Sequence, residues 1–139
     1  DTIQAAVLDI KLEHLDAYCK ARYDAAQKYS YTLRDIKELI TPEESAFSTH
    51  VYHQYTLKVL NGKRDALRDY LEANGISAMV YYPIPLNKQE AFMKIASQAG
   101  DMSISDKLSD EVLSLPIHTE LDFKTIHYIT SKIREFFSK

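Results

Sequence analysis

Glycine is scarce in this sequence, with Gly62, Gly75 and Gly100 as the three glycines among 139 residues. They stand far apart, so no glycine-rich loop can bring several backbone amides onto one phosphate group. The chain alone is therefore not expected to bind a nucleotide or a phosphorylated cofactor tightly. Ser48 and Ser114 have no histidine and carboxylate at the spacing of a hydrolase triad, so a serine hydrolase is not expected.

Cysteine is scarcer still. Cys19 is the one cysteine, so the chain forms no internal disulfide. That usage is typical of a reducing compartment, and we expect a cytoplasmic protein. The helical, apolar neighbourhood of Cys19 favours a buried structural thiol over a catalytic one. The residues from Asp1 to Gln4 do not resemble the start of a signal peptide, and none is expected.

Long apolar runs and clusters of basic residues are missing too. No stretch is long enough to cross a bilayer, so no membrane partner is expected. With a net charge of −3 and no stripe of lysine or arginine, nucleic acid is not an expected partner either. The content of 45% hydrophobic and 27% charged residues instead predicts one globular domain with a buried core over residues 1–139.

Two neighbouring stripes of apolar residues follow a helical period from about Thr2 to Thr32. A single helix of about thirty residues would be roughly 45 Å long, which is more than the width of a small domain. Part of this helix is therefore expected to pack on another domain or another subunit. Because the helical pattern begins at Asp1 without a lead-in, we expect this boundary to lie inside a longer protein.

Strands and shorter helices are expected in the rest of the chain. Val51 to Val59 alternates between apolar and polar residues, which predicts a strand with His53, Tyr55 and Leu57 on one side. The order of elements predicts an α+β fold: a small, mostly antiparallel sheet packed with helices, after a long N-terminal helix. The other expected elements are a loop at 41–45, a turn at 61–62, helices at 64–73, 88–97, 104–111 and from the cap Asp122 onward, strands at 76–82 and 112–115, and strand character near 38–41.

The most unusual stretch is Tyr81-Tyr82-Pro83-Ile84-Pro85. A strand that ends in two tyrosines and a rigid Pro-x-Pro corner holds those rings in fixed directions. A tyrosine ring has a flat apolar body and a hydrogen-bonding tip, which suits a sugar or a base. The alternative is that both rings fill a seam between the sheet and a helix. The residues alone do not decide between these two interpretations.

The histidines do not form a recognisable metal site. His50 and His53 are three residues apart, but on a strand such residues face opposite sides, and no Cys, Asp or Glu flanks them at ligand spacing. No metal site is therefore expected. On the apolar side of its strand, His53 is expected to be a core or interface residue, with a substrate contact as the alternative.

Five stretches together carry a family resemblance. They are Asp1-Thr2-Ile3-Gln4-Ala5-Ala6, His50-Val51-Tyr52-His53-Gln54-Tyr55, Arg64-Asp65-Ala66-Leu67 with Gly75-Ile76, Val80-Tyr81-Tyr82-Pro83-Ile84-Pro85-Leu86 with Gln89, and Leu113-Ser114-Leu115-Pro116-Ile117-His118. In this order they resemble the C-terminal third of the DegT-type (DegT/DnrJ/StrS) sugar aminotransferases. The resemblance covers nearly the whole chain.

The resemblance implies an activity for a longer parent protein. Such enzymes use pyridoxal phosphate to move an amino group, usually from glutamate, onto a keto group of a nucleotide-sugar. In the family, the lysine that binds the cofactor lies in a larger upstream domain. An Asn-x-Arg pair, which reaches the cofactor phosphate of a neighbouring subunit, is expected just before Asp1. The chain alone is therefore expected to contain no catalytic residue, to bind no cofactor and to be inactive, and the parent is expected to be a homodimer.

The resemblance also points to residues that contact substrate. Tyr81, Tyr82 and Asn87 are expected to face the nucleotide-sugar, and His53 and Tyr55 are the further candidates from the strand motif. The sequence departs from the family at Tyr81 and Asn87, where the family often has histidine. Two other functions are kept beside this one. They are a free-standing α+β module that binds a small molecule, and an interaction domain that self-associates through its first helix.

Overall fold

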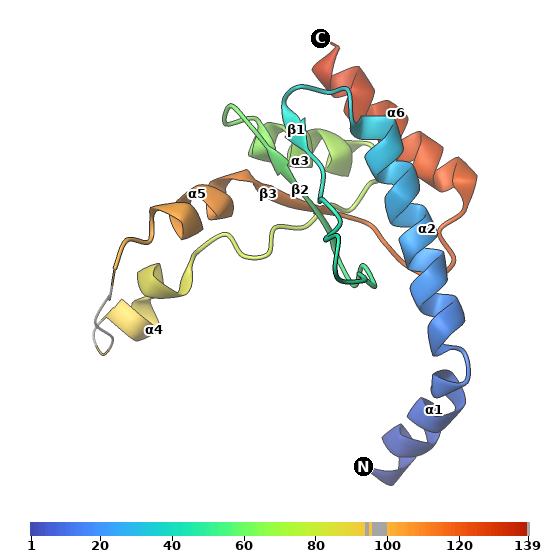
Figure 1. Ribbon diagram of the computed structural model, residues 1–139. Coiled ribbons are helices and arrows are strands. Elements are labelled where there is room, and N and C mark those ends of the chain that lie inside the picture. Colours follow the sequence, from blue (N-terminus) through green and yellow to red (C-terminus); the bar gives the residue numbers. More distant parts are fainter. Residues whose placement is uncertain (94, 96–99, 139) are drawn as a thin grey trace.

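Figure 1 shows a computed structural model of the chain, which describes residues 1–93, 95 and 100–138. A body of sheet and helices lies at the centre, helix α1 projects from it at the N-terminal end, and the segment with α4 and α5 projects on the opposite side. The elements are α1 (Thr2–Leu12), α2 (Leu15–Leu33), β1 (Leu39–Ile40), β2 (Tyr55–Val59), α3 (Arg64–Ala73), the 3-10 turn η1 (Leu86–Lys88), α4 (Glu90–Met93), α5 (Ser103–Glu111), β3 (Val112–Leu115) and α6 (Phe123–Phe137).

The sheet is antiparallel and has the strand order β1-β2-β3. Along β2 every second residue is buried, because successive side chains on a strand point to opposite faces and only one face meets the core. The register of the central pair sets Leu57 opposite Leu113, and both side chains are buried. On the other side of β3, Met79 forms an isolated antiparallel bridge with Ser114.

Three amphipathic helices cover the buried face of the sheet. Helix α2 packs against α6, and α3 packs against both α6 and β3. Burial of their apolar stripes supplies most of the stabilisation, since removing apolar surface from water is the main favourable contribution to folding. The helical core residues are Ala25, Ala26, Tyr29, Leu33, Leu67, Leu71, Ile126, Ile129 and Ile133.

The predicted α+β fold with a small antiparallel sheet is confirmed. Helix α3 and strand β3 have the predicted bounds, and β1 lies within the segment where strand character is expected. Gly75 follows α3 with a positive φ of 74°, which is the left-handed conformation that glycine accepts most readily at a helix end. Turn residues and local patterns in the sequence therefore predicted these elements correctly.

The prediction of one continuous helix from about Thr2 to Thr32 is wrong. The helix is interrupted at Glu13 and His14, so it forms two helices, α1 and α2. The sequence has neither proline nor glycine at this point, and the apolar period continues through it. Helix α1 has no buried residue, so no core contact among the described residues fixes its direction relative to α2.

The prediction of a strand from Val51 to Val59 is wrong in its first half. Tyr52 has a positive φ of 46°, and its backbone N–H donates to Nδ1 of His50 at 2.9 Å, which makes a local turn instead of a ladder. The carbonyl oxygen of Val51 accepts a hydrogen bond from Nε of Arg22 at 3.0 Å. As a result, Tyr52 is buried and His53 is exposed, which reverses the predicted faces.

Two further elements differ from the sequence prediction. The strand expected at 76–82 is reduced to the bridge at Met79, although Ile76 and Ala78 are buried and Ser77 and Met79 are exposed, as a strand would place them. Of the helix expected at 88–97, the structure describes α4 over Glu90–Met93, and the positions 94 and 96–99 lie outside the described residues.

The cap of the last helix gives a prediction for stability. Oδ1 of Asp122 accepts a hydrogen bond from the backbone N–H of Thr125 at 2.7 Å. Hydrogen bonding to Thr125 lowers the pKa of Asp122 below its usual value. The pKa of Asp122 is thus lower in the folded than in the unfolded chain. The ionised cap therefore stabilises the folded state at pH values above the unfolded pKa, and this stabilisation is lost as the pH falls through the folded pKa.

Asp122→Ala is therefore expected to lower the melting temperature of the chain at pH 7. The difference from wild type should shrink as the pH falls below about 4, where free carboxyl groups become protonated. Circular dichroism melts at several pH values measure both effects. Asp9→Ala, in the exposed helix α1, is the matched control. A difference between wild type and Asp122→Ala that does not change with pH would contradict this account.

Candidate functional site

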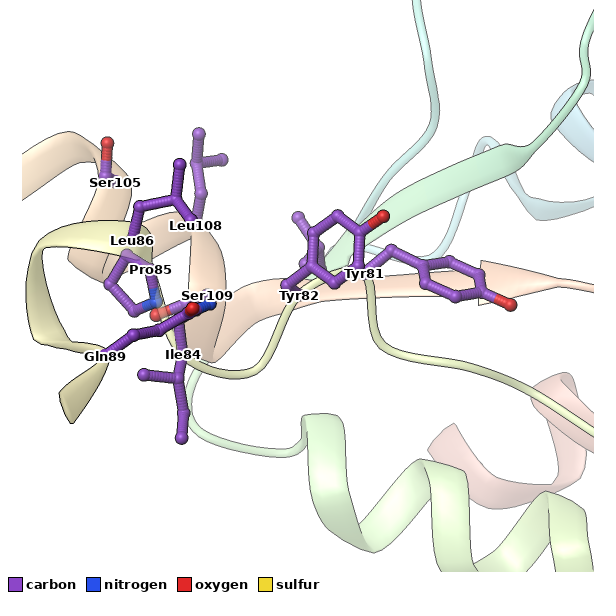
Figure 2. A pocket seen from close by; sticks show the side chains of 10 residues that line it. Tyr81, Tyr82, Ile84, Pro85, Leu86, Gln89, Ser105, Leu108 and Ser109 are labelled. Carbon is purple, nitrogen blue, oxygen red and sulfur yellow. The ribbon is translucent and has the colours of Figure 1, made fainter. Parts of the chain in front are cut away.

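One hollow that contains residues of the sequence motifs lies between the segment after Met79 and helix α5 (Figure 2). We call it the tyrosine hollow; its volume is about 570 Å³. Two aromatic rings, four aliphatic side chains, one proline ring and three neutral polar side chains surround it. The lining residues are Tyr81, Tyr82, Ile84, Pro85, Leu86, Gln89, Ser105, Leu108, Ser109 and Val112.

The two prolines explain why the chain leaves the sheet here. Neither Pro83 nor Pro85 has an N–H to donate to a ladder, so the strand pairing stops at Met79. Pro85 has an extended backbone and is followed directly by η1. The side-chain amide of Gln89 donates to the carbonyl oxygen of Ile84 at 3.4 Å. This segment therefore forms a fixed corner that holds the two tyrosines in front of it.

The two tyrosines are available to a ligand. Tyr82 is 72% exposed and Tyr81 is 39% exposed. Their rings meet edge to face, with the centroids 5.8 Å apart, and the peptide bond between them is cis. Figure 2 shows the rings at one end of the segment, with Pro85 and Leu86 at the other end beside Ser105 and Leu108 of α5. The hollow thus combines flat apolar surfaces with hydroxyl groups.

Helix α5 forms the opposite wall and is held at both ends. At its N-terminus, the carboxylate of Asp101 accepts hydrogen bonds from the backbone N–H and the hydroxyl of Ser103, at 3.0 and 2.7 Å. Lys88 of η1 forms an ion pair with Asp106 at 2.9 Å, which links the two sides of the hollow. At the other end, the guanidinium group of Arg64 donates to the carbonyl oxygen of Ser109.

A second hollow lies next to the first. Tyr81 belongs to both, so the two share a wall. This second one, which we call the histidine hollow, has a volume of about 260 Å³. The structure therefore places Tyr81 beside Tyr82 in the first hollow and with His53, from a separate sequence motif, in the second. The residues that line the histidine hollow are His53, Gln54, Ser77, Met79, Tyr81, Ser114, Leu115, Pro116 and Ile117.

Tyr55 does not lie in either hollow. Its side chain is fully buried, its hydroxyl group shares a 2.9 Å hydrogen bond with that of Ser30, and its ring lies 5.1 Å from that of Tyr29. Burial raises the pKa of Tyr55 to about 12. In this chain Tyr55 is therefore a core residue, which favours a structural role over the predicted substrate contact.

Asn87 has a different position again. It lies in η1 and is half-buried, but it is not among the residues that line the tyrosine hollow. Gln89, which belongs to the same sequence motif, does line it. Sequence reasoning did not select Gln89 or the α5 residues Ser105, Leu108 and Ser109 as site residues. Gln89 could have been selected, because it belongs to the family motif. The α5 residues belong to no such motif, and only the folding of the chain brings them to the hollow.

The charge of the two hollows limits what they can bind by themselves. Among the described residues that line them, none is Lys, Arg, Asp or Glu. Pyridoxal phosphate needs a lysine for its aldehyde and cationic groups or clustered amides for its phosphate. Neither hollow fits that cofactor. What the lining offers is aromatic surface, hydroxyl groups, a carboxamide and an imidazole, which suit a neutral, polar ligand.

The comparisons with known proteins agree on one family. The model of the DegT/DnrJ/EryC1/StrS aminotransferase family matches residues 1–134. The chain belongs to this family. The finding confirms the resemblance drawn from the five sequence motifs.

Relatives within the family are longer than this chain. A "Pleiotropic regulatory protein" from Geobacillus stearothermophilus is 38% identical, over 99% of this chain and 37% of that protein. A UDP-2-acetamido-2-deoxy-3-oxo-D-glucuronate aminotransferase from Pseudomonas aeruginosa is 35% identical, over 96% of this chain and 35% of its own length. The crystal structure of a family aminotransferase from Brucella abortus superposes on this chain with a TM-score of 0.91 at 36% identity. The superposition covers all of this chain and 36% of the Brucella abortus protein. The chain thus spans about a third of the relatives that it matches.

Two other features are absent from the described part of the chain. None of its helices is both long enough and apolar enough to span a membrane. Within the described ranges, no group of three or more His, Cys, Asp or Glu side chains lies close enough together to hold a metal ion.

Proposed function

We propose that this chain is the C-terminal small domain, residues 1–139, of a cytoplasmic aminotransferase that uses pyridoxal phosphate. The complete enzyme transfers an amino group from an amino acid, with glutamate as the expected donor, to the keto group of a nucleotide-sugar. In this proposal the tyrosine hollow forms part of the wall of the sugar site. The membership of the family and the name of the Pseudomonas aeruginosa relative support this assignment.

The observation that carries the proposal is the composition of the tyrosine hollow. Tyr81 and Tyr82 offer ring faces and hydroxyl groups to a sugar or a base, and Gln89 and Ser105 add neutral polar groups. No lysine lines the hollow within the described residues. The cofactor supplies the electron-withdrawing ring on which amino transfer depends. In the proposed enzyme this chain binds and orients the acceptor, and the lysine belongs to another part of the protein.

Helix α1 supports the proposal that this chain packs against more protein. Its apolar residues are exposed, among them Ile3 at 77%, Ile10 at 66% and Leu12 at 65%. Burial of one such side chain contributes about 1.5–3 kcal/mol, so exposed neighbours on one helix mark a surface for association. In the complete enzyme we propose that α1 is covered by the rest of the protein or by the second subunit of a homodimer.

The test compares residues 1–139 alone with the complete gene product. Mixed with pyridoxal phosphate, residues 1–139 alone are expected to show no visible absorbance band of a lysine-bound cofactor. The complete gene product is expected to show that band and to convert a UDP-linked or dTDP-linked keto sugar to its amino form with glutamate. Borohydride reduction followed by mass spectrometry would locate any bound cofactor. A single modified lysine within residues 1–139 would contradict the proposed division of roles.

A second candidate is a binding module that is not an enzyme. The Geobacillus stearothermophilus relative, at 38% identity, carries a regulatory name. If the complete gene product bound a nucleotide-sugar but never transferred nitrogen from ¹⁵N-labelled glutamate to it, this candidate would replace the first. Both candidates predict that the complete gene product binds a nucleotide-sugar, and the ¹⁵N-labelled product decides between them.

A further inference from the structure

The buried Arg64 has no role in the site as described so far. It is the first residue of α3, its side chain is 9% exposed, and it is one of the few charged or polar groups in the core. A guanidinium group is costly to bury unless each part of it is paired. Its hydrogen bonds show where that pairing comes from, and they lead to the wall of the tyrosine hollow.

Arg64 donates three hydrogen bonds within the described part of the chain. Its Nη1 donates to the carbonyl oxygens of Ser109 at 2.8 Å and Val112 at 3.2 Å, and its Nε donates to Oδ1 of the adjacent Asp65 at 2.8 Å. Ser109 lies in the last turn of α5, where backbone carbonyls have no partner within the helix and carry partial negative charge. Helix α5 has no basic residue of its own in that turn. Arg64 supplies the missing cation from another element.

Besides Arg64, the ion pair of Asp106 with Lys88 of η1 holds helix α5, but few of its own side chains are buried. Ser109 is its one buried residue, while Ile104 is 74% exposed and Leu108 is 39% exposed. Figure 1 shows α5 extending away from the sheet, with β3 following directly after it. Ser109 and Val112, whose carbonyl oxygens bind Arg64, both line the tyrosine hollow, whereas Arg64 itself does not.

From this arrangement we infer that Arg64 is a positioning residue for the acceptor site. By binding the end of α5 and the start of β3, it fixes the angle at which α5 leaves the sheet. That angle sets the distance between the α5 side chains and Tyr81 and Tyr82 on the opposite wall. This inference rests on the proposed function in one respect, namely that the tyrosine hollow forms part of the wall of the sugar site.

The first measurement is hydrogen–deuterium exchange on the complete gene product, for wild type and for Arg64→Met. Methionine has a similar length and removes the cation, so the core stays filled while the carbonyl oxygens of α5 lose their donor. Exchange of the peptide that covers residues 103–111 is expected to become about tenfold faster, whereas that of α6 stays unchanged. Equal acceleration in α5 and α6 would mean general destabilisation and would overturn the inference, as would no change in either.

The second measurement is the affinity for a nucleotide-sugar, by calorimetry with UDP-N-acetylglucosamine and dTDP-glucose as probes. Arg64→Met is expected to weaken binding of the probe that wild type prefers by about five- to tenfold, and Arg64→Lys, which keeps the charge, by less. The KM for the amino donor should not change. An equal rise in the Kd of the probe and the KM of the donor would contradict a role specific to the acceptor wall.

The matched control is Arg68→Gln. This substitution removes a guanidinium group from the same helix, but Arg68 is paired with the exposed carboxylates of Asp65 and Asp69 and not with α5. It should change neither the exchange of α5 nor the affinity. If wild type bound neither probe, the acceptor class in the proposed function would fail. The exchange measurement alone would then decide whether Arg64 holds α5.

Discussion

Leu113→Ala is expected to lower the free energy of unfolding of the chain by about 3 kcal/mol, within the usual range of 2–5 kcal/mol for a buried leucine. Leu113 is fully buried on β3 and lies opposite Leu57 of the central strand. The substitution removes apolar contacts and leaves a cavity, because the two strands and the helices behind them cannot collapse freely. Marginally stable domains lose much of their stability through such a change.

Urea unfolding followed by circular dichroism measures this loss. Leu86→Ala is the matched control, because it removes the same atoms from a side chain that is 68% exposed. Its effect is expected to stay within about 0.5 kcal/mol. If Leu113→Ala were no more destabilising than Leu86→Ala, then β3 would not be part of the core that the structure describes. In that case the wall of the tyrosine hollow that includes Val112 of β3 would lose its support as well.

The sequence predicted best those elements whose ends are marked locally. Helix α3 follows the turn at Asn61-Gly62 and ends before Gly75, and both features depend on backbone conformations that few other residues adopt. The sequence failed where contacts from distant parts of the chain decide. Val51 to Gln54 has a strand pattern, but Arg22, from α2, takes the carbonyl oxygen of Val51. No periodicity within the segment could have shown this.

The candidate site was predictable to a similar extent. The Tyr81-Tyr82-Pro83-Ile84-Pro85 motif stands out by composition, and the structure places it at a hollow. The opposite wall could not be predicted from the sequence, because long-range contacts position α5. Strand β3, which follows α5, pairs in the sheet, and Arg64, 45 residues away from Ser109 in sequence, binds the carbonyl oxygen of Ser109. Tyr55 shows the converse case, because it belongs to a family motif but is buried in the core, a position that the motif alone does not reveal.

Tyr81→Ala is expected to have the largest effect on the proposed activity. Tyr81 is the one residue that lines both the tyrosine hollow and the histidine hollow among the described residues, so its ring separates and shapes the two. Loss of an aromatic ring that stacks on a base or sugar costs about 1–3 kcal/mol. The KM of the complete enzyme for the nucleotide-sugar should therefore rise by about five- to a hundredfold. The kcat should change little, because such contacts are made in both ground and transition states.

Two further variants show whether the ring itself is responsible. Tyr81→Phe keeps the flat surface and removes the hydroxyl group, so it should retain most of the affinity that Tyr81→Ala loses. Tyr31→Ala removes another exposed tyrosine, at 68%, which lies on α2 against Arg34 and away from both hollows. Steady-state kinetics with varied nucleotide-sugar and varied glutamate would measure all three. A rise in the KM for glutamate equal to that for the sugar would place the defect in the fold or the shared active site. A wild-type KM for Tyr81→Ala would remove the tyrosine hollow from the acceptor site altogether.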